Sequence, residues 1–91
     1  HINSAIMVDC SHGNSNKDFT KQPLVLQNVI QTMNSFPNLI GVMLESNLLS
    51  GNQKLIFGEK HTLKYGISIT DSCIDIDTTQ NIIFSSYQLI N

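Results

Sequence analysis

The 91-residue sequence contains no arginine and no tryptophan, and only 13% of its residues are charged. Its five basic residues are outnumbered by seven acidic ones, which gives a net charge of −2. This balance excludes the basic surface that a nucleic-acid-binding protein needs. No apolar run approaches the ~18 residues of a membrane-spanning helix. We therefore expect neither nucleic acid nor a membrane as a partner.

Cysteine is also scarce: the sequence has only Cys10 and Cys73. These two form neither a CxxC pair nor a disulfide framework. Free thiols indicate a reducing compartment, so we predict a cytoplasmic protein. The N-terminal stretch lacks the basic start and the cleavage site of a signal peptide, and it lacks an initiator methionine. The length allows one domain at most, and we expect the chain to be a piece of a longer protein.

Apolar runs and helical stripes predict the order strand, helix, strand, long loop, strand, helix. The strands are expected over 4–10, 39–44 and 65–71, and the first two are short continuous apolar runs, as in strands covered on both faces. Pro23 suits the first turn of the first helix. Its apolar stripe comprises Leu26, Val29, Ile30 and Met33.

The second helix is predicted over 78–90. Asp77 is its expected N-cap, with Gln80 three residues later as in a capping box. Its buried stripe is expected to comprise Ile83, Tyr87 and Ile90.

A side chain that can bind a metal stands at or just after the end of each predicted strand: His12, Glu45 and Asp71. Their separations of 33 and 26 residues bracket the ~31 residues of one βα unit in a (β/α)₈ barrel. Parallel strands would bring all three to the C-terminal rim, where such barrels keep their active sites. One imidazole and two carboxylates suit a catalytic divalent metal. Taken singly, each residue has an ordinary alternative as a solvated or turn-capping side chain.

Cys10 lies two residues before His12 and would face the same way if the strand continued, so it is a possible fourth ligand. The alternative, a small buried core thiol, is favoured. The other histidines, His1 and His61, lie at a terminus and in a loop, and we expect both to be solvated.

Three stretches resemble, in order and spacing, the C-terminal part of class I 3-deoxy-D-arabino-heptulosonate-7-phosphate (DAHP) synthases: IMVDCSHGNSNKDFTKQPLV, IGVMLESNLLSGNQKL and LKYGISITDSCIDIDTT. The patterns DxSHxNS, GVMxES and YGxSITDxCI carry the resemblance, which covers nearly the whole chain. It implies an α/β fold that forms the C-terminal part, about strands six to eight, of a (β/α)₈ TIM barrel. Residues 1–91 would then be the C-terminal portion of a single catalytic domain whose N-terminal part is missing.

The resemblance also implies a reaction. Phosphoenolpyruvate condenses with D-erythrose 4-phosphate and water to give DAHP and phosphate, the first step of the shikimate pathway to the aromatic amino acids. These two substrates are the implied partners, and the full-length protein is expected to be a homo-oligomer. The 91 residues alone are expected to be inactive.

In the DAHP synthase family that this chain resembles, a Cys, a His, a Glu and an Asp hold a divalent metal. By motif, His12, Glu45 and Asp71 match the last three. The family's cysteine comes from an early strand, so Cys10 does not match it. This donor set admits manganese, iron, cobalt or zinc.

The sequence departs from the family pattern at two places, neither of them a ligand position. Asn47 stands where the family commonly has a histidine, and Asp75-Ile76 stand where it commonly has Gly-Trp. Two other functions stay open: another metal-dependent barrel aldolase acting on a different sugar phosphate, and a non-catalytic barrel remnant.

Overall fold

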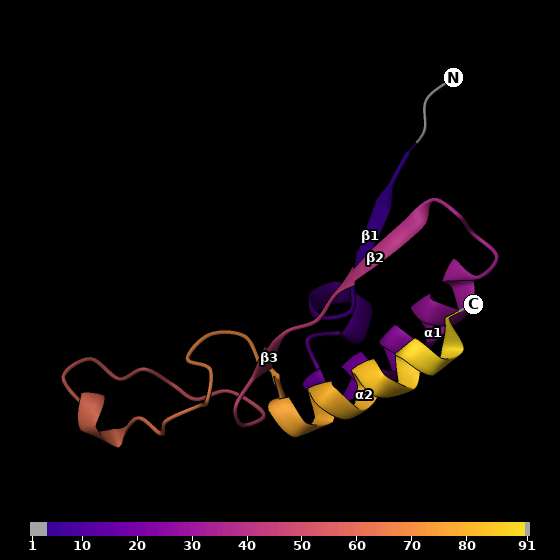
Figure 1. Ribbon diagram of the computed structural model, residues 1–91. Coiled ribbons are helices and arrows are strands. Elements are labelled where there is room, and N and C mark those ends of the chain that lie inside the picture. The colour runs from indigo at the N-terminus through magenta and orange to yellow at the C-terminus, as the bar shows by residue number, and fades with distance from the viewer. Residues whose placement is uncertain (1–3, 91) are drawn as a thin grey trace.

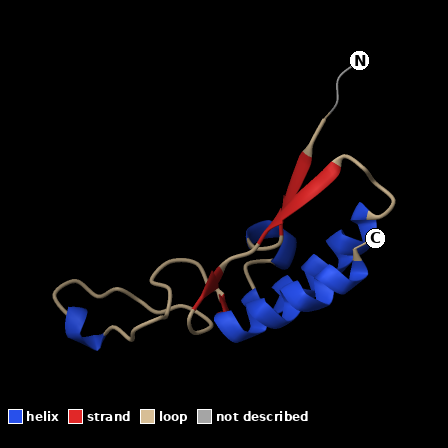
Figure 2. Ribbon diagram, in the orientation of Figure 1, coloured by secondary structure: helices blue, strands red, loops and turns tan. Residues whose placement is uncertain are grey.

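The computed structural model describes residues 4–90, which form two short parallel sheets, two long helices and a projecting arm (Figure 1). In chain order the elements are β1 (Ile6–Asp9), the 3₁₀ helices η1 (His12–Ser15) and η2 (Phe19–Lys21), α1 (Gln22–Met33), β2 (Leu39–Met43), β3 (Ser46–Asn47), the 3₁₀ helix η3 (Lys60–Thr62), β4 (Ile74–Asp75) and α2 (Ile76–Leu89). Helices α1 and α2 lie side by side along one side of the strands (Figure 2). Within residues 4–90, no helix combines the length and the apolar character needed to cross a membrane.

β1 and β2 pair in parallel, with Ile6 opposite Leu39 and Asp9 opposite Met43. α1 is the crossover between them, as a parallel pair requires. The predicted α1 stripe is confirmed, since its apolar residues join the core with Cys10 and Leu39: Leu26, Val29 and Ile30 are buried, and Met33 packs against them. Because β1 and β2 run the same way, the residues that follow them emerge at one edge of the sheet.

The predicted strand over 65–71 is wrong, because that stretch consists of turns and bends with one isolated bridge between Asn52 and Ser68. Gly66 adopts φ +83°, which turns the chain. The hydroxyl of Ser68 accepts a hydrogen bond from the backbone N–H of Thr70 at 3.1 Å, a local bond that competes with a sheet ladder. The strand found in this region is β4, which pairs in parallel with β3.

The predicted cap of α2 is also wrong, because the helix begins at Ile76 and its N-cap is Asp75 rather than Asp77. The Asp75 carboxylate accepts hydrogen bonds from the backbone N–H of Thr78 at 3.1 Å and from its hydroxyl at 2.6 Å. Asp75 keeps an extended backbone, whereas Asp77 already lies in the first helical turn. Asp75 therefore supplies the helix cap.

The apolar stripe predicted for α2 is exposed rather than buried, with Tyr87 78% exposed and Ile83 53% exposed. With Ile90, these residues line an apolar groove of about 230 Å³ between α2, α1 and β2. Helical periodicity identified the apolar face correctly. No element among residues 4–90 covers it.

The arm, residues 53–65, projects away from the two helices and carries η3 (Figure 1). Gln53 ties its two limbs together, since its side chain accepts a hydrogen bond from Lys64 N–H at 2.9 Å and donates to the carbonyl oxygens of Lys64 and Ile67 at 2.8 and 2.9 Å. Phe57 in the arm is fully exposed.

Candidate metal centre

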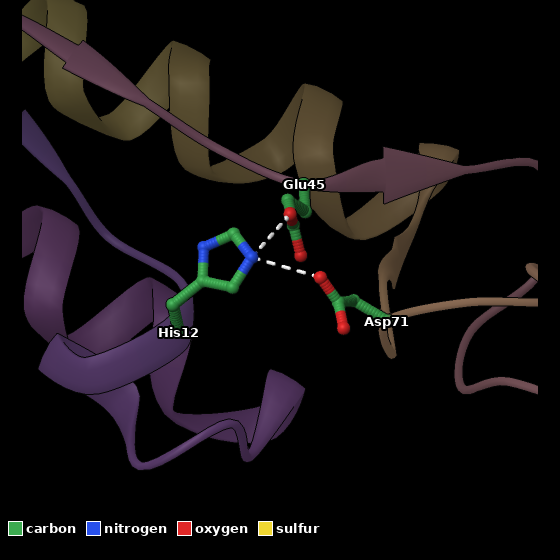
Figure 3. Close-up of side chains that lie close together, drawn as sticks. All are labelled: His12, Glu45 and Asp71. Atoms are coloured by element: carbon green, nitrogen blue, oxygen red, sulfur yellow. Dashed lines mark hydrogen bonds and ion pairs between the residues drawn. The ribbon is translucent and has the colours of Figure 1, made fainter.

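His12, Glu45 and Asp71 meet at the edge of the sheet where β1 and β2 end (Figure 3). Nε2 of His12 lies 3.1 Å from Oε1 of Glu45 and 2.8 Å from Oδ2 of Asp71. One ligand atom from each residue lies within 4.8 Å of the others. The structure thus brings together all three residues that the sequence analysis singled out.

The geometry and chemistry of this group fit a divalent cation. Ligand bonds of about 2.0–2.2 Å place neighbouring donor atoms of one ion about 3–3.5 Å apart, close to the separations at His12 Nε2. An imidazole nitrogen with two carboxylate oxygens suits manganese, iron, cobalt or zinc. Exposure of the side chains, 41% for His12 and 56% for Asp71, leaves room for further ligands.

A tight loop after β1 delivers His12. The backbone of His12 is left-handed, with φ 47°, and so are those of Asn16 and Lys17, with φ 53° and 60°. The carbonyl oxygen of His12 accepts a hydrogen bond from the Lys17 N–H at 2.7 Å, which closes the loop. Left-handed backbone costs a non-glycine residue roughly 1–2 kcal/mol, and such strain clusters at functional sites.

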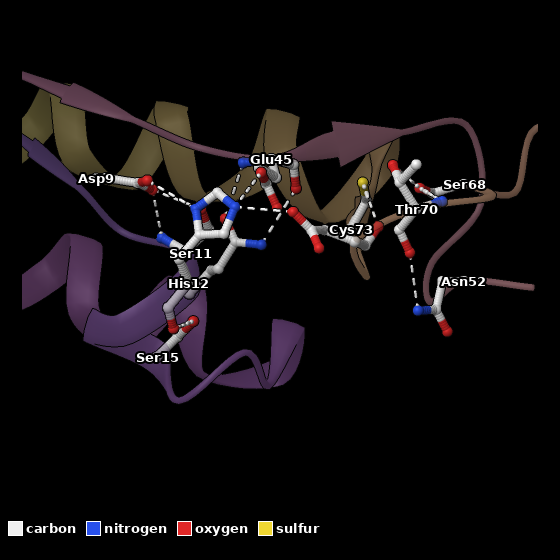
Figure 4. Close-up of polar contacts among 11 residues, drawn as sticks. Asp9, Ser11, His12, Ser15, Glu45, Asn52, Ser68, Thr70 and Cys73 are labelled. Carbon is white, nitrogen blue, oxygen red and sulfur yellow. Dashed lines mark hydrogen bonds and ion pairs between the residues drawn. The ribbon is translucent and has the colours of Figure 1, made fainter.

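Asp9 orients the other side of the His12 ring (Figure 4). Its Oδ2 lies 2.8 Å from Nδ1 of His12, and its Oδ1 accepts hydrogen bonds from the backbone N–H and the hydroxyl of Ser11. The Ser11 hydroxyl, more than any other group, holds the pKa of Asp9 below its usual range. Metal-bound histidines commonly donate their second ring N–H to a carboxylate. Nε2 of His12 hydrogen-bonds the Asp71 carboxylate at 2.8 Å. A bound cation would replace the proton on Nε2 and leave the ring proton on Nδ1, toward Asp9.

The charges around His12 favour a cation. The hydrogen bond to Asp9 raises the pKa of His12 most, and the hydrogen bond to Asp71 is the next largest cause. The negative charge of Glu45 raises this pKa further. Three carboxylates surround one imidazole, so a bound positive charge offsets their mutual repulsion.

Glu45 follows the end of β2, and its backbone is held from the side by Gln22. The Gln22 side chain accepts a hydrogen bond from Glu45 N–H at 3.0 Å and donates one to the Glu45 carbonyl at 3.2 Å. Among the three clustered residues Glu45 has the least exposed side chain, at 22%. Gln22 therefore fixes the backbone of Glu45 at the position from which its carboxylate contacts His12.

Asp71 comes from a bend rather than from a strand end. The neighbouring segment after β3 holds this bend, since Gly51 and Cys73 form an antiparallel bridge. The side chain of Asn52 also donates a hydrogen bond to the carbonyl of Thr70 at 3.0 Å (Figure 4). Tertiary pairing thus places Asp71 opposite His12.

A cavity of about 110 Å³ opens beside the three residues. Its wall also includes Ser15, Lys17, Phe19 and Asn52. Lys17 is the one lysine or arginine among the residues that line it. The cavity is large enough for water molecules or a small polar group next to the candidate ligands.

Cys10 lies apart from this group, and its prediction as a core thiol is confirmed. Its side chain is fully buried in the core between α1 and the sheet. Burial raises the pKa of the Cys10 thiol, which disfavours the thiolate that binds metals.

His61 is exposed in the arm, as expected, whereas His1 lies outside the described residues. Asn47 turns its side-chain oxygen to the N–H of Leu48.

Asp9 and Gln22 support the candidate ligands, and neither was predicted from the sequence. Asp9 carries a local signal, because it lies three residues before His12 and the loop between them is short. Gln22 carries none, because its partner Glu45 is 23 residues away along the chain. Only the packing of α1 against the end of β2 reveals it.

Comparison with known proteins places the chain in one family. Residues 1–83 match the sequence model described as the DAHP synthetase I family. The chain is 41% identical over 91 residues to the Tyr-sensitive phospho-2-dehydro-3-deoxyheptonate aldolase of Escherichia coli (strain K12), covering 99% of this chain and 25% of that protein. It is 46% identical over 80 residues to the phenylalanine-inhibited phospho-2-dehydro-3-deoxyheptonate aldolase of Saccharomyces cerevisiae, covering 86% of this chain and 22% of that protein.

A solved structure agrees with this assignment. The phospho-2-dehydro-3-deoxyheptonate aldolase from Francisella tularensis SCHU S4 superposes with a TM-score of 0.85 at 40% identity, covering 94% of this chain and 24% of that one. The chain therefore spans about a quarter of the length of the relatives described. Since the family match extends over 83 of its 91 residues, the chain belongs to the DAHP synthetase I family.

Proposed function

We propose that this chain is the C-terminal portion, about strands six to eight, of a (β/α)₈ barrel in which His12, Glu45 and Asp71 hold a divalent metal. The complete protein would condense phosphoenolpyruvate with D-erythrose 4-phosphate and water to give DAHP and phosphate. One observation carries the proposal: three ligand atoms from segments far apart in sequence converge within 4.8 Å in a member of the DAHP synthetase I family.

The residues of this chain would have distinct tasks in that reaction. A divalent ion bound there would supply Lewis-acid polarisation of a substrate carbonyl oxygen. Asp9 holds the Nδ1 side of His12, so that Nε2 stays available as a ligand. The two carboxylates of Glu45 and Asp71 provide negative charge for the cation. Lys17, on the wall of the adjacent cavity, offers a positive charge suited to anionic substrates.

The exposed apolar surface supports the proposal that further barrel elements complete this unit. Met7 on β1 is 66% exposed and Ile40 on β2 is 63% exposed. Strands of a (β/α)₈ barrel are covered on both faces, by the packed interior and by the helices. The missing elements would cover these side chains and the apolar groove beside α2.

Substitution of each ligand in the full-length protein tests this proposal. His12→Ala, Glu45→Ala and Asp71→Ala should each lose stoichiometric metal and DAHP formation, by more than the ~10–100-fold typical of a lost outer partner. His61→Ala is the control, because His61 is exposed in the arm. Metal content after dialysis and the rate of DAHP formation are measured together. Full metal content and turnover in His12→Ala would refute the proposal, and a wild type that binds metal without forming DAHP would indicate a non-catalytic remnant.

A further inference from the structure

We infer that Gln22 is a positioning residue for Glu45. Its buried carboxamide holds both the N–H and the carbonyl of Glu45, and so sets where the Glu45 carboxylate meets His12. The inference rests on the proposed function, because it takes Glu45 to be a metal ligand.

The contacts of Gln22 are concentrated on one residue. The Gln22 side chain has no exposed surface, and buried polar groups need hydrogen-bond partners. Its Oε1 accepts from Glu45 N–H at 3.0 Å, and its Nε2 donates to the Glu45 carbonyl at 3.2 Å. A carboxamide offers the same donor and acceptor pair as a peptide group. Gln22 therefore bonds Glu45 as a neighbouring strand would.

Glu45 needs such a partner because of its place in the chain. β2 ends at Met43 and β3 begins at Ser46, so Glu45 lies in the gap between two strands. The last backbone bond from the β1 side is donated by Cys10 N–H to the Met43 carbonyl at 2.9 Å. On the β4 side, Ile74 N–H donates to the Glu45 carbonyl at 3.0 Å. The Gln22 side chain supplies the bond that Glu45 N–H makes.

The position of Gln22 also links Glu45 to the loop that carries His12. Gln22 is the first residue of α1, and η1 and η2 lead into it directly from His12. Gln22 also lines the cavity beside the candidate ligands. One continuous segment, residues 12–22, thus carries the imidazole and anchors the carboxylate 3.1 Å from it.

A merely structural tether between α1 and the sheet would have different consequences. Its loss would lower the stability of the fold and leave the metal affinity of the folded protein unchanged. A positioning residue affects metal affinity and kcat in molecules that remain folded, because a carboxylate displaced by a fraction of an ångström binds the cation less well.

The test uses the full-length protein with Gln22→Met, which keeps the length of the side chain and removes its donor and acceptor. Gln31→Met is the control, because Gln31 lies on the same helix and its side chain is exposed. The readouts are the dissociation constant for Mn²⁺ by chelator competition, kcat and KM separately, and denaturant unfolding. Gln22→Met should weaken Mn²⁺ binding by about 10–100-fold and lower kcat more than it raises KM. Gln31→Met should leave Mn²⁺ binding unchanged.

The outcomes separate this inference from the proposed function. If the wild type binds Mn²⁺, His12→Ala does not, and Gln22→Met binds it as tightly as the wild type, the inference is overturned and the proposed function stands. If His12→Ala binds Mn²⁺ normally, the proposed function itself fails. Should Gln22→Met not fold, Gln22→Asn decides, because its carboxamide is one methylene too short to reach Glu45. Wild-type affinity in Gln22→Asn overturns the inference, and weakened affinity supports it.

Discussion

Oδ2 of Asp9 lies 2.8 Å from Nδ1 of His12, while Nε2 of the same ring faces Glu45 and Asp71. The two nitrogens of one imidazole are thus divided between a supporting carboxylate and the candidate metal position. This division fixes the orientation of the ring and raises its basicity as a ligand.

Asp9→Asn should therefore weaken metal binding by about 10–100-fold in the full-length protein. The amide keeps the size of the side chain but loses the negative charge that supports His12. Asp18→Asn is the control, because Asp18 belongs to the same loop but hydrogen-bonds Thr20 instead. Isothermal titration of both variants with Mn²⁺ measures the difference. Equal affinities for the two variants would contradict the role assigned to Asp9.

Cys10→Ala should keep its stoichiometric metal, because the Cys10 thiol is buried in the core and away from the three candidate ligands. Its cost should fall on stability, at about 1 kcal/mol for the loss of one buried heavy atom. Elemental analysis and denaturant unfolding of the full-length variant give the two numbers. Loss of metal with an unchanged free energy of unfolding would show that the Cys10 thiol is a metal ligand rather than a core side chain.

Gly66→Ala should destabilise the protein more than Gly58→Ala. Both glycines have positive φ, +83° and +82°, so an added Cβ costs each roughly 1 kcal/mol or more in backbone strain. A Cβ at Gly66 would also lie 2.9 Å from Cβ of Leu48, whereas one at Gly58 meets nothing within 4 Å. Because Gly66 opens the bend that leads to Asp71, only Gly66→Ala should also weaken metal binding. Thermal unfolding and metal titration compare the pair, and equal effects would exclude the Leu48 contact as the cause.

Asp75→Ala should lower the melting temperature, and the loss should depend on pH. Hydrogen bonds from Thr78 hold the pKa of Asp75 below its usual range. A carboxyl with a depressed folded-state pKa stabilises the fold above its unfolded-state pKa, about 4, and loses that contribution as pH falls through the folded value. The melting-temperature difference between wild type and Asp75→Ala should therefore shrink below about pH 4. Asp77→Ala, which removes a first-turn carboxylate but no cap, is the control; an equal loss in both would rule out the cap.

The sequence by itself determined the parallel strand–helix–strand unit and two of the candidate ligands in their places. β1, α1 and β2 follow from short apolar runs and from the 3.6-residue spacing of Leu26, Val29 and Ile30, which are local signals. Parallel pairing then follows from the crossover. His12 and Glu45 come together because both follow the ends of these two strands, so their meeting needed no knowledge of distant contacts.

The tertiary structure decided the rest. Asp71 reaches His12 from a bend held by Gly51 and Asn52, and no periodicity along the chain encodes that pairing. Gln22 supports Glu45 through bonds that span 23 residues. Asp75 rather than Asp77 caps α2, because the helix begins at Ile76, two residues before the predicted start at residue 78. The apolar face of α2 was predictable, but its exposure was not, because burial depends on which other elements are present to pack against it.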